Sequence, residues 1–155
     1  MVKLKNIIAV RHGNYSSKDG LLTKKGIGQM IELGLFLEKN LRGSVEILSS
    51  PTPRTKQSAY TLKSKLSSNR EVKTCYELLC EEDNLYPGQE VDIHNKILTL
   101  GNKVNNLVLV SHFAIIDYVN YFAKEECGMS IGLENLAKGR AVHFYSESKI
   151  HKIIP

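Results

Sequence analysis

Residues 5–13 read Lys-Asn-Ile-Ile-Ala-Val-Arg-His-Gly, and this segment fixes the class of fold. Its centre, residues 7–10, is short, continuously apolar and rich in β-branched side chains, which is typical of a strand buried on both faces of a parallel sheet. The polar residues 14–20 that follow predict a loop. Arg11 and His12 therefore stand at the carboxyl end of a buried strand, where ligands bind in open α/β sheets.

Two later segments have the same form. Residues 45–48 are apolar except for Glu46 and lead into Ser-Ser-Pro-Thr-Pro-Arg, which ends at Arg54. Residues 107–110 are apolar and lead into Ser111 and His112. Because the carboxyl ends of parallel strands share one edge of a sheet, we expect two arginines and two histidines to meet at that edge.

The rest of the chain alternates between helices and strands. Thr23 can cap a helix whose apolar residues recur at helical spacing to about Lys39. The further expected elements are a helix that begins near Pro51 and Pro53 and ends at 67–69, a strand over 71–75, a surface loop over 77–88, a short helix over 93–100, a helix over 113–123, a loop over 128–139, and closing strands over 141–145 and 149–154. This order predicts one α/β domain over residues 1–155, a three-layer α/β/α sandwich with a mainly parallel central sheet and an antiparallel edge strand.

Composition narrows the class of partner. The chain has 155 residues, 42% of them hydrophobic, a formal net charge of +5 and a pI of about 9.1. This charge suits an acidic or phosphorylated partner. The lack of a Lys/Arg block interleaved with aromatic residues argues against a nucleic-acid groove. No run approaches the roughly 18 apolar residues of a membrane span, so no membrane association is expected.

Cysteine usage bears on the compartment. Cys75, Cys80 and Cys127 form no C-x-x-C pair. An odd number of cysteines without such a pair suits neither a disulfide framework nor a zinc site. The N-terminal apolar run is also too short for the core of a signal peptide. Both observations predict a cytoplasmic protein with reduced thiols.

The four side chains at the expected sheet edge suit phosphoryl transfer. This reaction spreads negative charge over three oxygens, so the protein must mainly position the group and neutralise that charge. The planar fork of an arginine binds two oxygens at once, which suits Arg11 and Arg54 to this role. Arg54 also lies in the first turn of a predicted helix, whose N–H groups favour an anion.

His12 is the predicted nucleophile. A neutral imidazole is available near pH 7 and attacks phosphorus through one nitrogen, while the other nitrogen should donate to a backbone carbonyl that fixes the tautomer. Gly13 lets the backbone pack closely beneath the ring. His112 is expected to donate to the transferred group. No metal is expected, because the remaining histidines lie on other predicted elements and supply no convincing third ligand (His94, His143 and His151).

Four motifs, taken together, resemble those of one family. They are Arg11-His12-Gly13, Leu22-Thr23 with Gly26, Ser49-Ser50-Pro51 with Arg54, Gln57 and Ala59, and Val110-Ser111-His112. They resemble the Arg-His-Gly, Leu-Thr-x-x-Gly, Ser-Ser-Pro-x-x-Arg-x-x-Gln-x-Ala and second-histidine segments of the histidine phosphatase superfamily, also called the phosphoglycerate mutase-like family. The motifs keep that family's order and span nearly the whole chain.

The resemblance implies a three-layer α/β fold, a phosphoenzyme on His12, a substrate pocket of Arg11, Arg54 and His112, and no cofactor. Asn14, directly after the first motif, is a further candidate for binding phosphate. The chain has little room for the insertions that larger members carry between the central strands. It therefore looks most like the small phosphohistidine phosphatases of the SixA type, which implies an open site and a phosphorylated protein as partner.

The same resemblance suggests a general acid. Larger members place a glutamate after the third strand as Leu-x-Glu, and Leu79-Cys80-Glu81 fits that spacing. Glu82 and Asp83 are adjacent, and a solvated acidic loop is the plain alternative, so the choice between Glu81, Glu82, Asp83 and no acid stays open. Phe113 stands where many members have glycine, which predicts a narrower pocket.

Three functions remain in play. The first is a protein phosphohistidine phosphatase, which has little need of Glu81 because imidazole is a better leaving group than an alkoxide. The second is a small-molecule phosphomonoesterase or mutase-like enzyme that acts on a phosphorylated metabolite with Glu81 as acid. The third is a phosphate-binding module without turnover. The intact pair of His12 and His112 favours the two enzymes.

Overall fold

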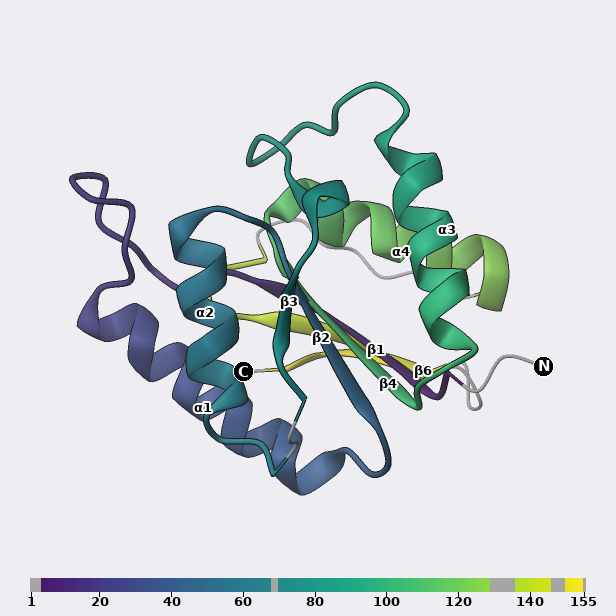
Figure 1. Ribbon diagram of the computed structural model, residues 1–155, viewed down its shortest axis with the longest axis horizontal. Helices are drawn as coiled ribbons and strands as arrows, with labels where there is room; N and C mark the ends of the chain where they lie inside the picture. Colours follow the sequence, from purple (N-terminus) through teal and green to yellow (C-terminus); the bar gives the residue numbers. More distant parts are fainter. Residues whose placement is uncertain (1–3, 68–69, 129–135, 146–149, 155) are drawn as a thin grey trace.

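The computed structural model describes residues 4–67, 70–128, 136–145 and 150–154. Within these ranges six strands form one sheet in the order β3-β2-β4-β1-β5-β6 (Figure 1). The strands are β1 (Asn6–Arg11), β2 (Val45–Ser49), β3 (Val72–Thr74), β4 (Asn106–Ser111), β5 (Ala141–Tyr145) and β6 (Ile150–Ile154). The first four run parallel, whereas β5 pairs antiparallel with β1 and β6 pairs antiparallel with β5. The predicted mainly parallel sheet with an antiparallel edge is confirmed.

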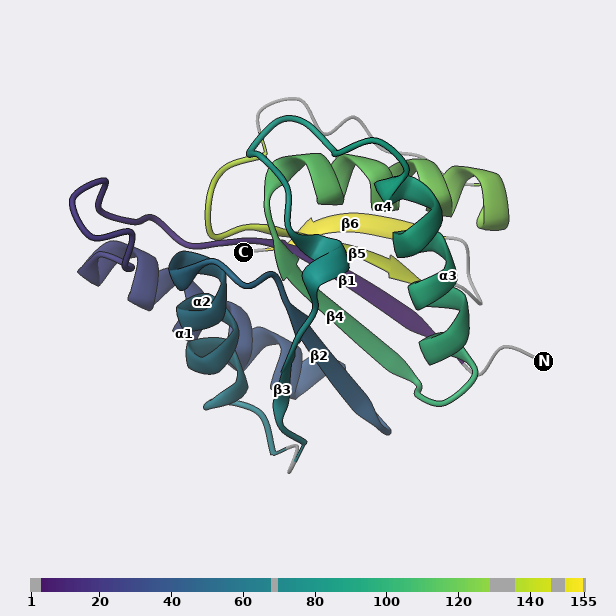
Figure 2. The same cartoon turned by 45° about the horizontal axis from the view of Figure 1, so that its top comes forward.

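Helices cover both faces of this sheet (Figure 2). They are α1 (Lys24–Asn40), α2 (Pro53–Lys63), α3 (Gln89–Gly101) and α4 (Phe113–Cys127), and a 3₁₀ turn, η1 (Tyr76–Leu78), precedes α3. The helices α1 and α2 lie on one face, and α3 and α4 lie on the other (Figure 1). The three-layer α/β/α sandwich is therefore confirmed.

Alternation of side chains along the strands gives each face its own core. In β1, Ile8 and Val10 pack toward α1 and α2, while Ile7 and Ala9 pack toward α3 and α4. Such a strand must be apolar at every position, which explains the unbroken run in the sequence. In the described part of the chain no helix is long and apolar enough to cross a bilayer.

Most predicted boundaries agree with the structure within a few residues. Thr23 caps α1, and its Oγ1 accepts a hydrogen bond from the N–H of Gly26 at 3.1 Å. The helix α2 ends at Lys63, before the predicted 67–69, of which residues 68–69 lie outside the described ranges. Most of the predicted loop over 128–139, and Lys149 of the last predicted strand, also lie outside them.

The predicted surface loop over residues 77–88 needs correction. Leu78 and Cys80 are buried in the core. The buried side chain of Gln89 donates to the carbonyls of Glu77 and Leu79 at 2.8 and 2.7 Å. The acidic composition of this segment gave no sign of these buried contacts. The hydrogen bonds from Gln89 hold residues 79–82 against the carboxyl ends of the central strands.

Candidate active site

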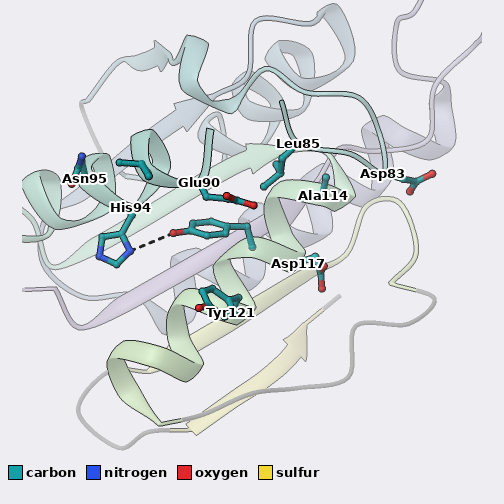
Figure 3. A pocket seen from close by; sticks show the side chains of 10 residues that line it. Asp83, Leu85, Glu90, His94, Asn95, Ala114, Asp117 and Tyr121 are labelled. Atoms are coloured by element: carbon teal, nitrogen blue, oxygen red, sulfur yellow. Dashed lines mark hydrogen bonds between the residues drawn. The ribbon is translucent and has the colours of Figure 1, made fainter. Parts of the chain in front are cut away.

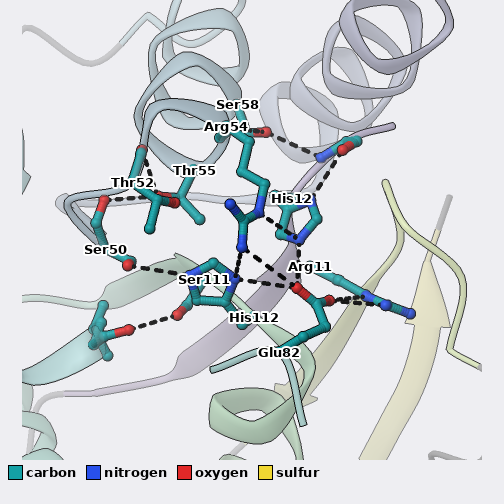
Figure 4. A network of polar contacts seen from close by, with 12 residues as sticks. Arg11, His12, Ser50, Thr52, Arg54, Thr55, Ser58, Glu82, Ser111 and His112 are labelled. Carbon is teal, nitrogen blue, oxygen red and sulfur yellow. Dashed lines mark hydrogen bonds and ion pairs between the residues drawn. The ribbon is translucent and has the colours of Figure 1, made fainter. Parts of the chain in front are cut away.

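Hydrogen bonds between neighbouring segments bring three strand ends together. The N–H of His12 donates to the carbonyl of Ser111 at 3.0 Å, and the N–H of Ser50 donates to that of Val110 at 3.0 Å. These bonds continue the parallel pairing of β1 and β2 with the central strand β4. The two arginines and two histidines expected at this edge lie together there (Figure 4).

The ring of His12 is fixed in one orientation. Its Nδ1 lies 3.0 Å from the carbonyl oxygen of Gly13. Because a carbonyl only accepts, this hydrogen bond requires a hydrogen on Nδ1 and directs Nε2 into the site. The residue is fully buried. The backbone carbonyl expected from the sequence is therefore present, and it belongs to the adjacent glycine.

The loop after His12 is held by side-chain hydrogen bonds with α2 and with the start of α1. Ser58 Oγ accepts from the N–H of Gly13 at 3.0 Å, and Gln57 Oε1 accepts from the N–H of Leu22 at 2.7 Å. Asn14 Oδ1 accepts from Thr23 Oγ1 at 3.0 Å, which ties this side chain to the start of α1. A contact between Asn14 and phosphate stays a prediction.

Arg54 lies between the two histidines. Its Nε is 3.4 Å from Nε2 of His12, and its Nη2 is 3.4 Å from Nδ1 of His112. The guanidinium also stacks on the ring of Tyr15, 4.7 Å from the centroid, and the ammonium of Lys138 lies at the same distance from that ring. Tyr15 thus lies against two cations, and nothing in the sequence pattern singled it out.

His112 and Arg11 complete the set from opposite sides. Nε2 of His112 is 3.4 Å from Oγ of Ser50, so Nδ1 faces the site. Burial lowers the pKa of His112. The hydrogen bond with Glu82 raises this pKa and the nearby charge of Arg54 lowers it, so that the pKa lies below the ordinary histidine value. Arg11 donates from Nη1 to the carbonyl of Leu136 at 2.6 Å, and its guanidinium lies 5.7 Å from the centroid of the Phe113 ring.

The carboxylate at the site comes from Glu82. Glu81 is exposed, and within the described residues the carboxylate that contacts both histidines is that of Glu82. Oε1 of Glu82 accepts from Nε and Nη2 of Arg11 at 2.9 and 2.8 Å. Oε2 lies 3.0 Å from Nε2 of His12 and 3.3 Å from Nδ1 of His112. The expectation of Glu81 is corrected by one residue, because the side chain of Glu81 is exposed while that of the adjacent Glu82 points toward the histidines.

Charge keeps the Glu82 carboxyl ionised. Burial raises its pKa, but hydrogen bonds from His112, His12 and Arg11 and the charge of His12 outweigh burial and hold the pKa well below its ordinary range. The loop carrying this residue is clamped at two points. Ser111 Oγ donates to the carbonyl of Leu78 at 2.9 Å, and the N–H of Ala114 donates to that of Glu82 at 2.9 Å.

The same three donors could in principle hold a metal ion. One ligand atom each from His12, Glu82 and His112 lies within 4.8 Å of the others, so Glu82 is the third donor that the sequence interpretation lacked. Two guanidinium groups also contact this carboxylate, with Nη2 of Arg54 3.8 Å from Oε2. Their positive charge opposes a divalent cation and favours an anion.

A groove of about 650 Å³ lies beside the site, between α3 and α4 (Figure 3). Apolar and aromatic side chains of Leu85, Ala114, Tyr118 and Tyr121 form part of its lining. Carboxylates of Asp83, Glu90 and Asp117 also line it, and no lysine or arginine does so among the described residues. Asp83 and Ala114 directly follow Glu82 and Phe113 in the chain, so the groove adjoins the site.

Comparison with solved structures identifies the fold. The protein histidine phosphatase SixA complexed with tungstate matches with a TM-score of 0.69 and 18% identity over 97% of this chain and 94% of that one. The chain has the fold of the histidine phosphatases. A putative SixA phosphohistidine phosphatase from Agrobacterium tumefaciens (TM-score 0.66, 14% identity, 97% and 96% of the two chains) has this histidine phosphatase fold too. So does a mycobacterial glucosyl-3-phosphoglycerate phosphatase complexed with VO₃ (TM-score 0.67, 15% identity, 97% of each chain covered). No family model and no curated protein matches the sequence.

Proposed function

We propose that this protein is a phosphatase that transfers a phosphoryl group first to Nε2 of His12 and then to water. One observation carries the proposal. His12 is buried with Nδ1 fixed by the Gly13 carbonyl, and its Nε2 faces a position that Arg11, Arg54 and His112 surround and that the carboxylate of Glu82 occupies. This arrangement offers a nucleophilic nitrogen together with the cations that a transferred phosphoryl group requires.

The two steps balance without a further reactant. The lone pair of His12 Nε2 attacks phosphorus, the bond from phosphorus to the substrate's leaving atom breaks, and the leaving atom takes a proton from solvent water. Water then attacks the phosphoenzyme, the bond from phosphorus to Nε2 breaks, and phosphate and a proton are released. In both steps Arg11 and Arg54 neutralise the oxygens, and His112 donates from Nδ1.

The favoured substrate is a protein phosphohistidine. Imidazole is a better leaving group than an alkoxide, so this reaction depends little on a general acid. Likeness of fold to SixA proteins over nearly the whole chain supports this substrate class. The adjoining groove offers room for a protein segment. We propose that a segment bearing apolar and basic side chains occupies it, because its lining combines aromatic rings with carboxylates.

The position of Glu82 favours a second candidate, a small-molecule phosphomonoesterase. An alkoxide leaving group needs a proton, and a positioned acid contributes about 10²–10⁴-fold. Glu82 borders the site, with Oε2 3.0 Å from His12 Nε2. To act as an acid it would have to move aside for the bound phosphoryl group and acquire a proton. In this candidate Glu82 takes the role that the sequence interpretation gave to Glu81.

Phosphate release distinguishes these candidates. Purified protein is assayed with a phosphohistidine-bearing carrier protein, with phosphoramidate and with p-nitrophenyl phosphate, and His12→Ala serves as control. Rapid release from the carrier that is lost in His12→Ala supports the phosphohistidine phosphatase. Preference for p-nitrophenyl phosphate, with a loss of about 10²–10⁴-fold in Glu82→Gln, supports the monoesterase. Phosphate binding without turnover on any of the three would leave only a binding module.

A further inference from the structure

The carboxylate of Glu82 and a bound phosphoryl group exclude each other. Oε2 of Glu82 lies 3.0 Å from Nε2 of His12. A phosphorus atom poised for attack must lie about 3–3.5 Å from the same nitrogen. Both anions therefore need the same small volume in front of His12.

The contacts of Glu82 are those that a phosphoryl group would make. Arg11 holds Oε1 through Nε and Nη2, at 2.9 and 2.8 Å. Oε2 lies 3.3 Å from Nδ1 of His112 and 3.8 Å from Nη2 of Arg54 (Figure 4). A carboxylate and a phosphoryl group both present at least two anionic oxygens to which the arginine fork can donate. Glu82 thus stands in for the anion of a substrate.

Glu82 also covers the nitrogen of the proposed nucleophile. Nδ1 of His12 is held by the carbonyl oxygen of Gly13, so Nε2 is the nitrogen left to attack. Oε2 of Glu82 lies 3.0 Å from Nε2, and Nε of Arg54 lies 3.4 Å from the same nitrogen. With Glu82 in place, a phosphorus atom cannot approach Nε2.

The side chain can leave without a rearrangement of its loop. The main chain is held by the hydrogen bond from the N–H of Ala114 to the Glu82 carbonyl at 2.9 Å. The Glu82 side chain itself is 28% exposed, so it has a route into solvent. Rotation about its side-chain bonds is enough to open the site while the backbone remains fixed.

We propose that Glu82 is an intramolecular anion that occupies the phosphoryl site of the free protein and is displaced by substrate. This inference rests on the proposed function, because it assumes that the space before His12 receives a phosphoryl group. If the site is open in only a fraction of the molecules, the apparent dissociation constant is the intrinsic one divided by that fraction. Glu82 therefore lowers the affinity for phosphate, and its return competes with the product.

Binding of inorganic phosphate at pH 7, measured by isothermal titration calorimetry, tests this inference without any turnover. Four proteins are compared: the unmodified protein, Glu82→Ala, the isosteric Glu82→Gln, and Glu81→Ala as a control that removes an equal charge one residue away. If the carboxylate occupies the site in 90–99% of molecules, Glu82→Ala binds phosphate about 10- to 100-fold more tightly. Glu82→Gln shows a smaller gain because its amide keeps the size of the side chain, and Glu81→Ala is unchanged.

The outcomes separate this inference from the proposed function. Equal or weaker phosphate binding by both Glu82 variants, with normal binding by the unmodified protein, overturns the inference and leaves the phosphate site standing. An equal gain in Glu81→Ala also overturns it, because the effect would then be one of general charge. If neither the unmodified protein nor any variant binds phosphate, the proposed function fails as well. Thermal unfolding of each variant identifies any that is not folded, and Glu82→Gln then replaces Glu82→Ala.

Discussion

Gly26, in the first turn of α1, lies directly against the backbone of Asn14. A Cβ atom on Gly26 would collide with the carbonyl oxygen of Asn14, and a Cβ on Gly13 would stand 2.8 Å from the carbonyl oxygen of Gly26. The loop that follows His12 thus passes over the helix with no room for a side chain on either glycine. This contact gives a physical reason for the spacing of the first two sequence motifs.

Replacement of Gly26 by alanine should therefore destabilise the protein. Overpacking against backbone atoms costs about 1–3 kcal/mol, and the displaced loop carries His12, so phosphate release should fall as well. Gly28→Ala is a matched control two residues away in the same helix. Its added Cβ meets no atom within 4 Å, and alanine is a better helix former by about 0.5–1 kcal/mol. Urea denaturation should show opposite signs for the two variants, and equal signs would contradict this packing.

Glu82 should make stability depend on pH in a defined direction. The folded-state pKa of this carboxyl lies below its ordinary value, so as the pH falls the unfolded chain binds a proton before the folded protein does. Its contribution is fully present above the ordinary glutamate pKa of about 4.3 and is lost as the pH falls below it. The free energy of unfolding should exceed that of Glu82→Gln by about 1–3 kcal/mol at pH 7, and the difference should shrink toward pH 3. A difference that is constant or grows on acidification would contradict the contacts of Glu82.

Ligand binding should compensate for the lost carboxylate. In Glu82→Gln the cations that surround Oε1 and Oε2 lose their counter-charge. Inorganic phosphate should then raise the midpoint of thermal unfolding of Glu82→Gln by more than it raises that of the unmodified protein, because at one ligand concentration the stabilisation grows as the dissociation constant falls. Glu81→Gln should respond as the unmodified protein does. A smaller shift in Glu82→Gln than in Glu81→Gln would argue against competition for one site.

The histidines and arginines could be predicted because their positions depend on local pattern. A short apolar run followed by a polar motif indicates a strand end, and parallel pairing with β4 is enough to bring His12, Arg54 and His112 together. The carboxylate could be predicted only to within three residues. Which of residues 81–83 faces the site depends on distant hydrogen bonds, from Ser111 to Leu78 and from Ala114 to Glu82.

The place of Tyr15 in the site also could not be predicted from local sequence pattern. It lies in the polar loop after the first motif, and its role follows from the cations of Arg54 and Lys138 on its ring. Those residues come from α2 and from a segment more than a hundred positions away, so no local spacing in the sequence predicts their contact with the Tyr15 ring. Similarly, Gln57 could be recognised as a motif residue, but the hydrogen bonds by which Gln57 and Ser58 hold the loop of Gly13 and Leu22 are evident only in the structure.

The groove should govern recognition of a protein substrate and leave small substrates unaffected. Asp117→Lys combined with Tyr121→Ser removes a carboxylate and an exposed ring from its lining. We expect kcat/KM for a phosphohistidine carrier protein to fall about 10-fold or more, because this is the scale of a lost contact of 1.4 kcal/mol. The rate with phosphoramidate should not change. Glu32→Lys, an exposed charge reversal on α1 across the sheet, is the control. Parallel losses for both substrates would contradict a docking role.

The covalent intermediate provides the decisive measurement. The protein is mixed with a ³²P-labelled phosphohistidine carrier, quenched within milliseconds to seconds, and digested for mass spectrometry. We expect label that is stable to base and labile to acid, located on His12 and absent from His12→Ala. Phosphate release with no labelled histidine at any time point, or with label on another residue, would contradict the proposed function.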